Sequence, residues 1–273
     1  MSNYAIPQFT ITELNSAGRM LSTFGDGTPD KYAHAISVVD NWRASHAYPL
    51  LIFYQTLKNR ATKINKSALV AQRTKRLISI IEKLKREDQM KLSQMQDIGG
   101  CRAVLGTLEQ VRELEQIYLS RRWEHEELNH KDYIEHPKPS GYRSIHLKYK
   151  YKGIGEKSSY NGLKIEIQLR TNLQHTWATA VETAGTFTKQ ALKSNIGNGS
   201  WLRFFSLMSS VFAIREDCPI VPETSEKLNE LVDEIRAINN SHQIVNSFSG
   251  TTAVLNHVLK QKNAVYFLVT LDP

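Results

Sequence analysis

Apolar residues in the first third of the chain recur every three or four positions, which is the spacing of amphipathic helices. This pattern predicts one helix over residues 31–46. A second helix is expected to begin near Pro49, because proline is favoured in the first turn of a helix. The same spacing predicts a third helix from about Ser67 to Lys85, and residues 1–30 precede all three as an N-terminal segment.

Farther along the chain the repeat changes to an alternation of apolar and polar residues, which indicates strands. A short buried strand is predicted over 101–107 and a helix over 108–120. Residues 142–152 and 162–171 both alternate, and the turn-forming pair Asn161-Gly162 stands at the start of the second run. The two runs are therefore predicted to pair as a hairpin.

Helices are predicted to follow over 171–187, 201–216 and 225–240. Helices around a few strands of mixed order indicate an α+β domain over 31–216, with a mixed β-sheet surrounded by helices. Residues 217–273 are predicted to be a helical extension that ends in a strand. Because such a strand needs a partner, our hypothesis is that this extension begins a regulatory domain of a longer natural chain.

The composition is that of a globular protein with an excess of positive charge. Hydrophobic residues make up 41% of the 273 residues, and the net charge is +8. The region from Lys58 to Lys91 contains eleven Lys or Arg residues and only three acids, which favours anionic partners such as nucleotides, RNA or DNA. Apolar runs such as Leu50 to Tyr54 are far too short for a membrane span. With no secretory signal and two isolated cysteines, we expect a cytoplasmic protein that does not bind a membrane.

Several common catalytic motifs are absent from the sequence. It contains neither a P-loop nor a nucleophile elbow. His125 and His130 superficially suggest a zinc protease, but they are five positions apart and a shared helical face requires four. We therefore expect these two histidines to be solvated surface residues.

Two carboxylates beside predicted strands are candidates for a metal site. Asp97 precedes a Gly-Gly turn, and its alternative role is to cap that turn. Glu166 projects from the polar face of a predicted strand, where it could equally be an exposed residue. Carboxylates on neighbouring strands are suited to Mg²⁺ when substrate phosphates supply its other ligands. The pair therefore predicts a Mg²⁺ site only in combination with nucleotide-binding residues.

Basic and aromatic residues near these acids predict such binding. Four basic side chains could surround a triphosphate: Arg73, Lys75, Lys83 and Arg86. Tyr142 could stack on a base while Lys138 and His146 contact its phosphates. The alternatives are a basic helix exposed to solvent and a tyrosine that simply begins a strand.

Four stretches in series resemble the synthetase domain of the RelA/SpoT family, in the family's order and at similar spacing. They are RTKRLISIIEKLKR, MQDIGGCRAVL, KDYIEHPKPSGYRSIH and EIQLRTNLQHTWATAVE. The resemblance covers about residues 30–190 and implies a nucleotidyltransferase-like fold. It also implies transfer of the β,γ-diphosphate of ATP to the 3′-hydroxyl of GDP or GTP. That reaction makes the alarmone (p)ppGpp of the stringent response and releases AMP.

The resemblance also assigns roles by position. Two residues match the family's catalytic and Mg²⁺-binding acids: Asp97 and Glu166. Five match ATP-binding residues of the family: Arg73, Lys75, Ser79, Lys83 and Arg102. In the family, the two arginines lie on either side of the adenine. Five match residues that surround the acceptor: Lys138, Tyr142, His146, Gln168 and Arg170. The resemblance implies that the tyrosine among them stacks on guanine. Arg76 departs from the family pattern, in which a small hydroxyl residue is more common, so local phosphate contacts are expected to differ.

Two other functions stay open at this point. A toxin of the same fold would modify the 3′-terminal adenosine of tRNA and block translation, and the basic region supports this alternative. An inactive RNA-binding or regulatory relic would have no need for both acids. The His-Asp pair of the family's hydrolase half is absent, so we expect synthesis without degradation. Restraint would then come from the C-terminal segment or a separate antitoxin, and the oligomeric state is left open.

Overall fold

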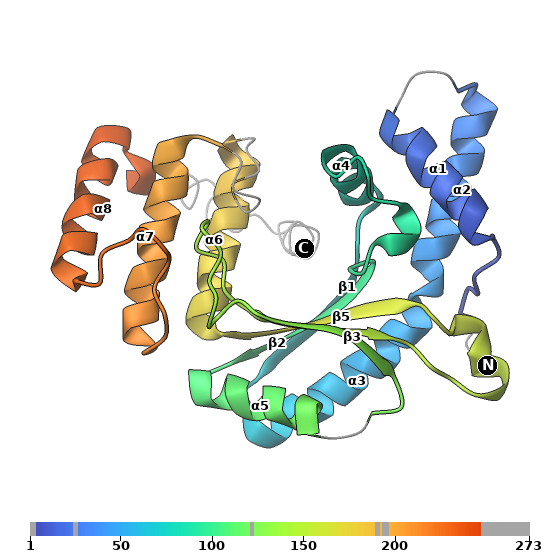
Figure 1. Ribbon diagram of the computed structural model, residues 1–273, viewed down its shortest axis with the longest axis horizontal. Coiled ribbons are helices and arrows are strands. Elements are labelled where there is room, and N and C mark those ends of the chain that lie inside the picture. Colours follow the sequence, from blue (N-terminus) through green and yellow to red (C-terminus); the bar gives the residue numbers. More distant parts are fainter. Residues whose placement is uncertain (1–3, 24–26, 121–122, 189–191, 193–196, 247–273) are drawn as a thin grey trace, which may run out of the picture. The chain divides into compact units, whose positions relative to one another are not determined.

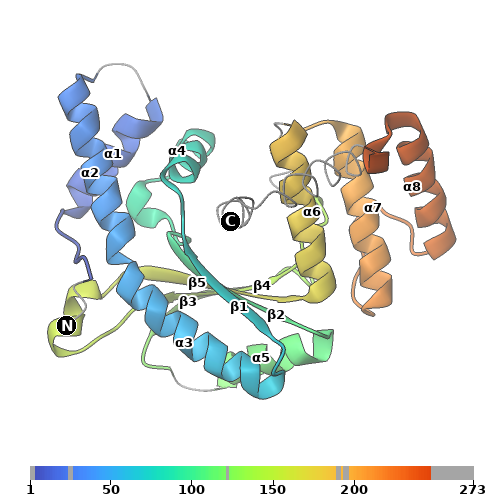
Figure 2. The ribbon, with the colours of Figure 1, turned by 180° about the vertical axis from the view of Figure 1, so that it is seen from behind.

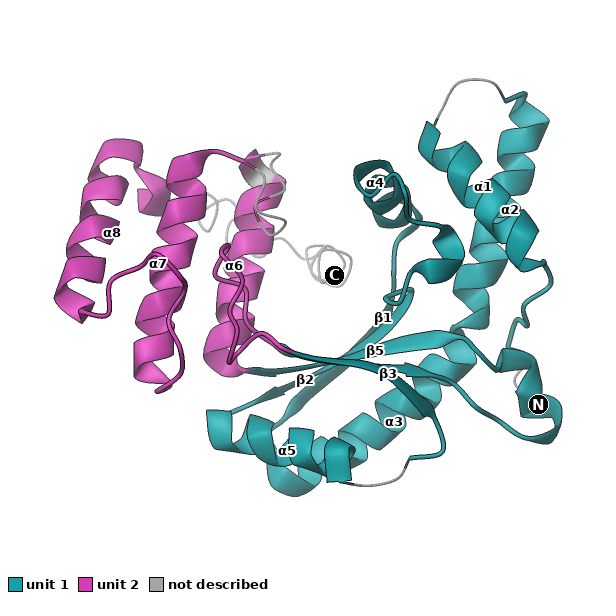
Figure 3. Cartoon of the chain, viewed as in Figure 1, with its two compact units in different colours: residues 1–131, 145–170 teal, residues 132–144, 171–273 magenta. Residues whose placement is uncertain are grey.

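The computed structural model describes residues 4–23, 27–120, 123–188, 192 and 197–246. The chain divides into two compact units, coloured separately in Figure 3. Unit 1 comprises Met1–Lys131 and Ile145–Arg170, and unit 2 comprises Asp132–Ser144 and Thr171–Pro273. The domain boundaries proposed at residues 30 and 216 stay predictions. The helix and strand predicted after residue 250 lie outside the described residues.

A five-stranded sheet with the strand order β1-β2-β5-β4-β3 forms the centre of unit 1 (Figure 1). Its strands are β1 (Leu69–Thr74), β2 (Gly99–Leu105), β3 (Glu126–Asp132), β4 (Ile145–Lys150) and β5 (Lys164–Thr171). Strands β4 and β5 pair antiparallel, with Lys148 opposite Glu166, so the predicted hairpin is confirmed. A short 3-10 helix, η2 (Gly155–Tyr160), lies in the connection between them. The α+β class is confirmed as well.

One face of the sheet is apolar and is covered by two helices. Its fully buried side chains from the hairpin are Ile145, Leu147, Ile165, Ile167 and Leu169. Tyr149 continues this face and contacts Phe53 of α3 (Ala47–Ile64) and Tyr118 of α5 (Leu108–Ser120). Figures 1 and 2 show these two helices on the same side of the sheet. Because strand side chains alternate, the polar residues of the hairpin project from the opposite face.

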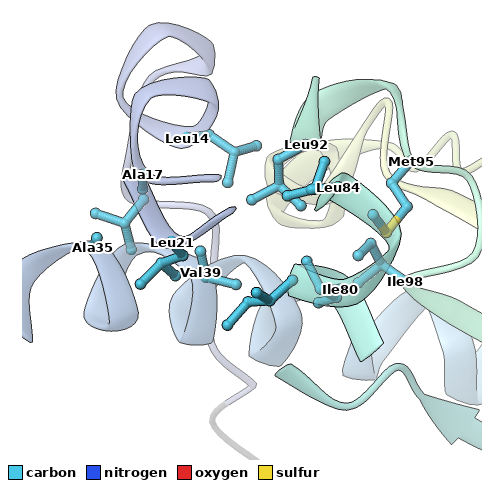
Figure 4. Packing of buried hydrophobic residues seen from close by; sticks show 12 residues of the cluster. Leu14, Ala17, Leu21, Ala35, Val39, Ile80, Leu84, Leu92, Met95 and Ile98 are labelled. Atoms are coloured by element: carbon cyan, nitrogen blue, oxygen red, sulfur yellow. The ribbon is translucent and has the colours of Figure 1, made fainter. Parts of the chain in front are cut away.

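A second apolar cluster joins the remaining elements of unit 1. These are α1 (Ile11–Thr23), α2 (Pro29–Ser45), α4 (Leu77–Arg86) and the 3-10 helix η1 (Leu92–Gln94). Figure 4 shows side chains from all of them meeting in one core, among them Leu14, Leu84 and Leu92. Contact is close at Gly18, where a Cβ atom would lie 2.8 Å from the Cβ of Leu92. This packing fixes α4 on unit 1 and leaves its polar side available for other contacts.

The helix predicted from Ser67 to Lys85 is wrong in its first half. Residues Leu69–Thr74 form β1, which pairs antiparallel with β2, and α4 begins only at Leu77. Six residues of mixed polarity at a sheet edge have no marked period, so pairing with β2 decides their structure rather than local pattern. As a result, Arg73 lies on a strand and does not share a helix with Lys83.

The sequence pattern also did not predict α1 or β3. Strand β3 is polar on both faces, so it shows no alternation. His125, just before it, is only 8% exposed and stacks on Phe53 at a ring-centroid distance of 4.7 Å. His130 Nε2 lies 2.7 Å from Oε1 of the buried Glu115. The expectation that both histidines are solvated is therefore wrong for His125, which is buried in the packing of unit 1, and confirmed for His130, which is exposed.

In the residues that the structure describes, unit 2 combines three helices with the segment 132–144. The helices are α6 (Asn172–Thr188), α7 (Gly199–Arg215) and α8 (Leu228–His242), which confirms the three helices predicted in this part of the chain. Trp177 of α6 and Phe205 of α7 belong to a core cluster that also includes Tyr142. None of the helices in the described part of the chain has the length and apolar character that a membrane crossing requires.

Candidate active site

Asp97 lies between η1 and β2 and is held by two lysines. Its Oδ2 accepts a hydrogen bond from Lys75 Nζ at 2.8 Å, and its Oδ1 accepts one from Lys83 Nζ at 3.1 Å. Burial raises the pKa of Asp97, but attraction to the two ammonium groups outweighs burial and leaves this pKa below its ordinary value. The carboxylate is therefore ionised at neutral pH and sits between two cations.

The backbone around Lys75 explains why this lysine reaches Asp97. The amide of Lys75 donates to the carbonyl of Ile98 at 2.7 Å, next to the start of β2. The carbonyl of Lys75 accepts from Arg43 Nε at 2.8 Å, and Arg43 is itself paired with Asp40 at 2.6 Å. The backbone of Lys75, just after β1, is thus hydrogen-bonded through both its amide and its carbonyl. These bonds hold the residue where its side chain reaches Asp97.

Glu166 occupies the middle of β5 and is 7% exposed. Its Oε1 lies 3.0 Å from His146 Nδ1 and 3.7 Å from Lys148 Nζ, and its Oε2 accepts from Gln168 Nε2 at 2.6 Å. Burial raises the pKa of Glu166, but the hydrogen bonds from His146 and Gln168 and the charge of Lys148 outweigh it, and the pKa falls to about 2. Glu166 is therefore ionised as well.

His146 contacts Glu166 as a neutral ring. Burial lowers the pKa of His146, and this effect exceeds the opposing influence of the Glu166 carboxylate. Because an ionised carboxylate can only accept hydrogen bonds, the short contact places the ring proton on Nδ1. His146 therefore orients Glu166 without adding a positive charge to the site.

The two carboxylates are close enough to affect each other. Repulsion from Glu166 is one of the influences that raise the pKa of Asp97. Their strands also approach closely, since a Cβ atom on Gly99 would lie 2.6 Å from Cδ1 of Ile165. Strands β2 and β5 are neighbours in the sheet, and Ile165 belongs to its apolar face, so this contact packs the sheet, and the link between the two acids is their electrostatic repulsion.

The acid pair fits a divalent cation that takes most of its ligands from a substrate. Within the described residues there is no group of three or more His, Cys, Asp or Glu side chains that could hold a metal. Mg²⁺ is commonly bound by one or two carboxylates, with phosphates and water completing its octahedron. Two neighbouring ionised carboxylates meet that requirement, whereas they would be a poor site for a tightly held structural metal.

The other residues assigned to ATP also lie on unit 1. Arg73 lies opposite Gly100 in the β1–β2 pairing, and Arg102 lies opposite Ala71. Directly opposite residues project from the same face of a sheet, as do residues two apart on one strand. Arg73 and Arg102 are therefore diagonal neighbours on one face. Ser79 is on α4, one turn before Lys83.

The predicted acceptor residues fall in two groups. His146, Gln168 and Arg170 belong to unit 1 and form a chain of contacts, because Arg170 Nη2 donates to Gln168 Oε1 at 2.8 Å and Gln168 in turn bonds Glu166. Lys138 and Tyr142 belong to unit 2 and are described separately. Their assignment to the acceptor stays a prediction.

Tyr142 is more buried than a base-stacking platform alone would require. Its ring is 4% exposed and makes edge contacts with Tyr133 and Trp177. The Nζ atom of Lys138 lies 5.3 Å from the centre of the Tyr142 ring and 4.6 Å from that of Tyr133. A base could stack on Tyr142 only if groups that cover this ring, Lys138 among them, move away.

Sequence reasoning did not assign three lysines on the polar face of the hairpin. Lys148 faces Glu166 directly, and Lys150 faces Lys164 in the next row. Lys150 pairs with Glu126 at 2.8 Å, and Lys164 Nζ donates to the carbonyl of Ser93 at 2.9 Å. The alternation of residues 142–152 already placed Lys148 and Lys150 on the polar side, but only the register shows that they flank Glu166.

A known family matches the part of the chain that contains these residues. Residues 72–191 match the family model described as a region found in RelA/SpoT proteins. This segment contains both acids and every other residue assigned above to ATP or to the acceptor. The resemblance seen in the sequence is therefore confirmed over this part of the chain.

One curated relative is GTP pyrophosphokinase YjbM of Bacillus subtilis (strain 168). It is 32% identical over 112 residues, which are 40% of this chain and 52% of the relative. The match thus spans about half the length of that protein.

Solved structures share the fold. The small alarmone synthetase 1 from Bacillus subtilis, bound to its product pppGpp, is 23% identical with a TM-score of 0.53, covering 65% of this chain and 94% of that one. The small alarmone synthetase 2 from Bacillus subtilis has 20% identity, a TM-score of 0.55 and the same two coverages. A GTP pyrophosphokinase family protein from Streptococcus pneumoniae has 21% identity and a TM-score of 0.53, covering 70% of this chain and 91% of that one.

Proposed function

We propose that this chain, which carries a RelA/SpoT region at residues 72–191, transfers the β,γ-diphosphate of ATP to the 3′-hydroxyl of GDP or GTP. The observation that carries the proposal is the position of Asp97, just before β2, between Lys75 and Lys83 and within electrostatic reach of Glu166. Acids that hold a cation and bases that hold phosphates are the two requirements of phosphoryl-type transfer. The GTP pyrophosphokinase name of the curated relative agrees with this reaction class.

The ATP triphosphate would exchange partners with Asp97. The side chains of Lys75, Lys83 and Asp97 are 16%, 21% and 26% exposed, so they can reorient without unfolding the core. Asp97 and Glu166 would hold Mg²⁺, and the bound ion would neutralise part of the phosphate charge. The two lysines would then turn from Asp97 to the phosphate oxygens, where ammonium groups form strong charged hydrogen bonds.

The acceptor reaction needs orientation more than a strong base. The 3′-oxygen of the acceptor forms a bond to the β-phosphorus of ATP, and the bond from that phosphorus to the α,β-bridging oxygen breaks, so AMP leaves. A carboxylate with a pKa of about 2 accepts a proton poorly, which argues against Glu166 as a strong general base in its present contacts. The loose transition state of such transfers tolerates late proton loss, and Glu166 would mainly align and stabilise the reacting groups.

A tRNA acceptor is the second candidate, and the basic region favours it. Eight of the eleven Lys and Arg residues between Lys58 and Lys91 are exposed, whereas Arg60, Lys75 and Lys83 are partly buried. Exposed basic residues along α3, β1 and α4 could contact phosphates outside the active site. A nucleotide acceptor has no need for such an extended surface.

The experiment is a transfer assay with ATP labelled at the γ-phosphate. Purified protein and Mg²⁺ are incubated with GDP, with GTP, with 3′-deoxyguanosine triphosphate or with deacylated tRNA. We expect label in products from GDP and GTP and none in the 3′-deoxy analogue. Asp97→Asn and Glu166→Gln serve as variants that should lose the transfer.

Each result decides between the candidates. Label that moves only to tRNA would replace the guanine nucleotide by tRNA as the acceptor. Label on neither acceptor, or equal labelling by wild type and both variants, would overturn the proposed transfer. Label on the 3′-deoxy analogue would contradict the 3′-hydroxyl as the site of attachment.

A further inference from the structure

Helix α7 holds the segment 132–144, which carries the predicted acceptor residues Lys138 and Tyr142. The Ser209 hydroxyl of α7 donates to the carbonyl of Gly141 at 2.6 Å and accepts from Arg143 Nε at 3.0 Å. Arg143 and Ser209 are both only 2% exposed. One buried hydroxyl therefore binds the segment on both sides of Tyr142.

The segment fits α6 and α7 at the level of its backbone. Gly141 has a φ of +89°, and a Cβ atom there would lie 2.8 Å from Cβ of Ser209, 2.9 Å from Cζ2 of Trp177 and 3.1 Å from the carbonyl oxygen of Phe205. Those distances are too short for any side chain. Trp177 Nε1 donates to the same Phe205 carbonyl at 2.8 Å, which joins the two helices at this point.

The anchor at Gly141 is linked to both predicted acceptor residues. The amide of Gly141 donates to the carbonyl of Lys138 at 2.8 Å, and the amide of Lys138 donates to the carbonyl of Tyr142 at 3.2 Å. The Tyr142 ring then packs on Trp177 with a centroid distance of 6.5 Å. The turn 138–142 is therefore one small unit, and its contacts with α6 and α7 determine where it lies within unit 2.

Arg143 extends the anchor to two other parts of unit 2. Its Nη1 donates to the carbonyl of Ile134 at 3.3 Å and lies 3.8 Å from Sγ of Cys218. Burial lowers the pKa of Arg143, and the nearby Cys218 and Glu216 oppose that shift only in part. A guanidinium in so buried a place is unfavourable unless its hydrogen bonds matter, which fits a role in fixing the segment.

We propose that Ser209 of α7, which lies beyond the matched region 72–191, is a positioning residue for the acceptor that acts through the segment 132–144. This proposal rests on the transfer reaction proposed above. Ser209 acts through Gly141 and Arg143 on Tyr142 and Lys138, and it has no part in ATP binding. Loss of its hydroxyl should therefore affect the acceptor selectively.

The chain offers a matched control on the same helix. Ser206 is also buried, at 6% exposure, but its hydroxyl donates to the carbonyl of Arg203 within α7. We would measure KM for GDP, KM for ATP and kcat in the full-length wild type, Ser209→Ala and Ser206→Ala. In Ser209→Ala we expect KM for GDP to rise about five- to tenfold, as for one lost buried hydrogen bond, with KM for ATP and kcat within about twofold. Ser206→Ala should match wild type in all three.

A general loss of structure would give a different result. If Ser209→Ala raises both KM values equally, or leaves KM for GDP unchanged, the positioning role is overturned. Hydrogen exchange of the full chain gives a second readout that needs no activity. Amides of residues 132–144 should exchange faster in Ser209→Ala than in Ser206→Ala, and equal protection would also overturn the proposal. A protein without any transfer would refute the proposed reaction, while this exchange comparison would still test the anchor.

Discussion

The acid site of unit 1 and the segment 132–144 of unit 2 are built from different kinds of interaction. Asp97, Lys75 and Lys83 are joined by ion pairs between side chains that keep partial access to water. Gly141, Tyr142 and Arg143 are buried and are held by backbone contacts, ring packing and one serine hydroxyl. The first arrangement can exchange partners when a charged substrate arrives, and the second cannot.

This difference suggests separate roles: the acid site for the chemistry of the reaction and the segment 132–144 for the placement of side chains. Partly exposed ion pairs contribute little to folding, so Asp97 and its two lysines can be altered without unfolding the protein. Close packing around a positive-φ glycine tolerates almost no change, so alterations there should appear as lost stability and misplaced side chains. Variants in the two regions should therefore fail in distinguishable ways.

The largest effect on the reaction is expected from Glu166→Gln. The variant keeps the shape of the side chain but removes the charge that the site presents to the metal and acceptor, so kcat should fall about 10² to 10³-fold. The melting temperature should fall as well, because the buried carboxylate also contacts His146, Lys148 and Gln168, so kcat is compared at a temperature where the variant is folded. Glu156→Gln, which neutralises an exposed carboxylate in η2, is the control and should retain full activity. A Glu166→Gln enzyme with normal kcat would remove Glu166 from the mechanism.

Gly141→Ala tests the close packing of the segment 132–144. Gly162 is its control, because it has a similar positive φ of +86° but no atom within 4 Å of the place a methyl group would take, whereas Gly141 has a φ of +89° and three close neighbours. Gly162→Ala should lower the free energy of unfolding by about 1 kcal/mol, the penalty of the left-handed backbone. Gly141→Ala should lower it by about 3 kcal/mol, because overpacking is added. Urea unfolding of both variants gives the comparison, and equal losses would show that the contacts with α6 and α7 are not tight.

His46 provides a pH-dependent test of the packing below the acid site. It is 1% exposed, bonds the carbonyl of Trp42 through Nδ1, and burial lowers its pKa to about 4 from the ordinary 6.5. Between pH 4 and 6.5, His46 is therefore neutral in the folded state but protonated in the unfolded chain. The contribution of neutral His46 to the free energy of unfolding is fully present above pH 6.5 and is lost as the pH falls toward 4. The loss at pH 5 is about 2 kcal/mol. Unfolding free energies at pH 7 and 5 should show this loss, and His46→Phe should reduce it. An unchanged slope in the variant would mean that other groups cause the dependence.

The smallest effect is expected at the ATP lysines, where water screens each contact. Lys83→Gln should raise KM for ATP about fivefold, since one partly exposed charge is worth about 1 kcal/mol. Lys85, an exposed residue on the same helix, supplies the control Lys85→Gln, which should leave KM for ATP unchanged. Equal effects of the two variants would indicate a general electrostatic attraction rather than a specific phosphate contact.

The sequence predicted the elements that have a clear hydrophobic period. The hairpin β4–β5 and the helices α5 and α6 follow directly from alternation or helical spacing, because one face of each is buried. Strand β1 could not be predicted in this way. It is a short edge strand of mixed polarity, and only its pairing with β2 distinguishes it from a helix.

The candidate site was predictable to the extent that its residues lie in short local motifs. Asp97 stands just before a strand and Glu166 within one, and the two carboxylates repel each other in the structure, while the shared cation stays a prediction. The contact of Lys148 with Glu166 depends on the register of two strands, and that of Ser209 with Gly141 joins residues 68 positions apart. Contacts of this kind are set by tertiary packing, and no local pattern in a single sequence reveals them.

The most direct test of the central claim is the identity of the adenine nucleotide that the reaction releases. Purified protein, Mg²⁺, ATP and GDP would be sampled over time and separated by ion-exchange chromatography. Transfer of the β,γ-diphosphate predicts AMP and a guanosine tetraphosphate in equal amounts, with neither formed when GDP is omitted. Release of ADP with a guanosine triphosphate would instead show transfer of a single phosphoryl group, and it would contradict the proposed reaction.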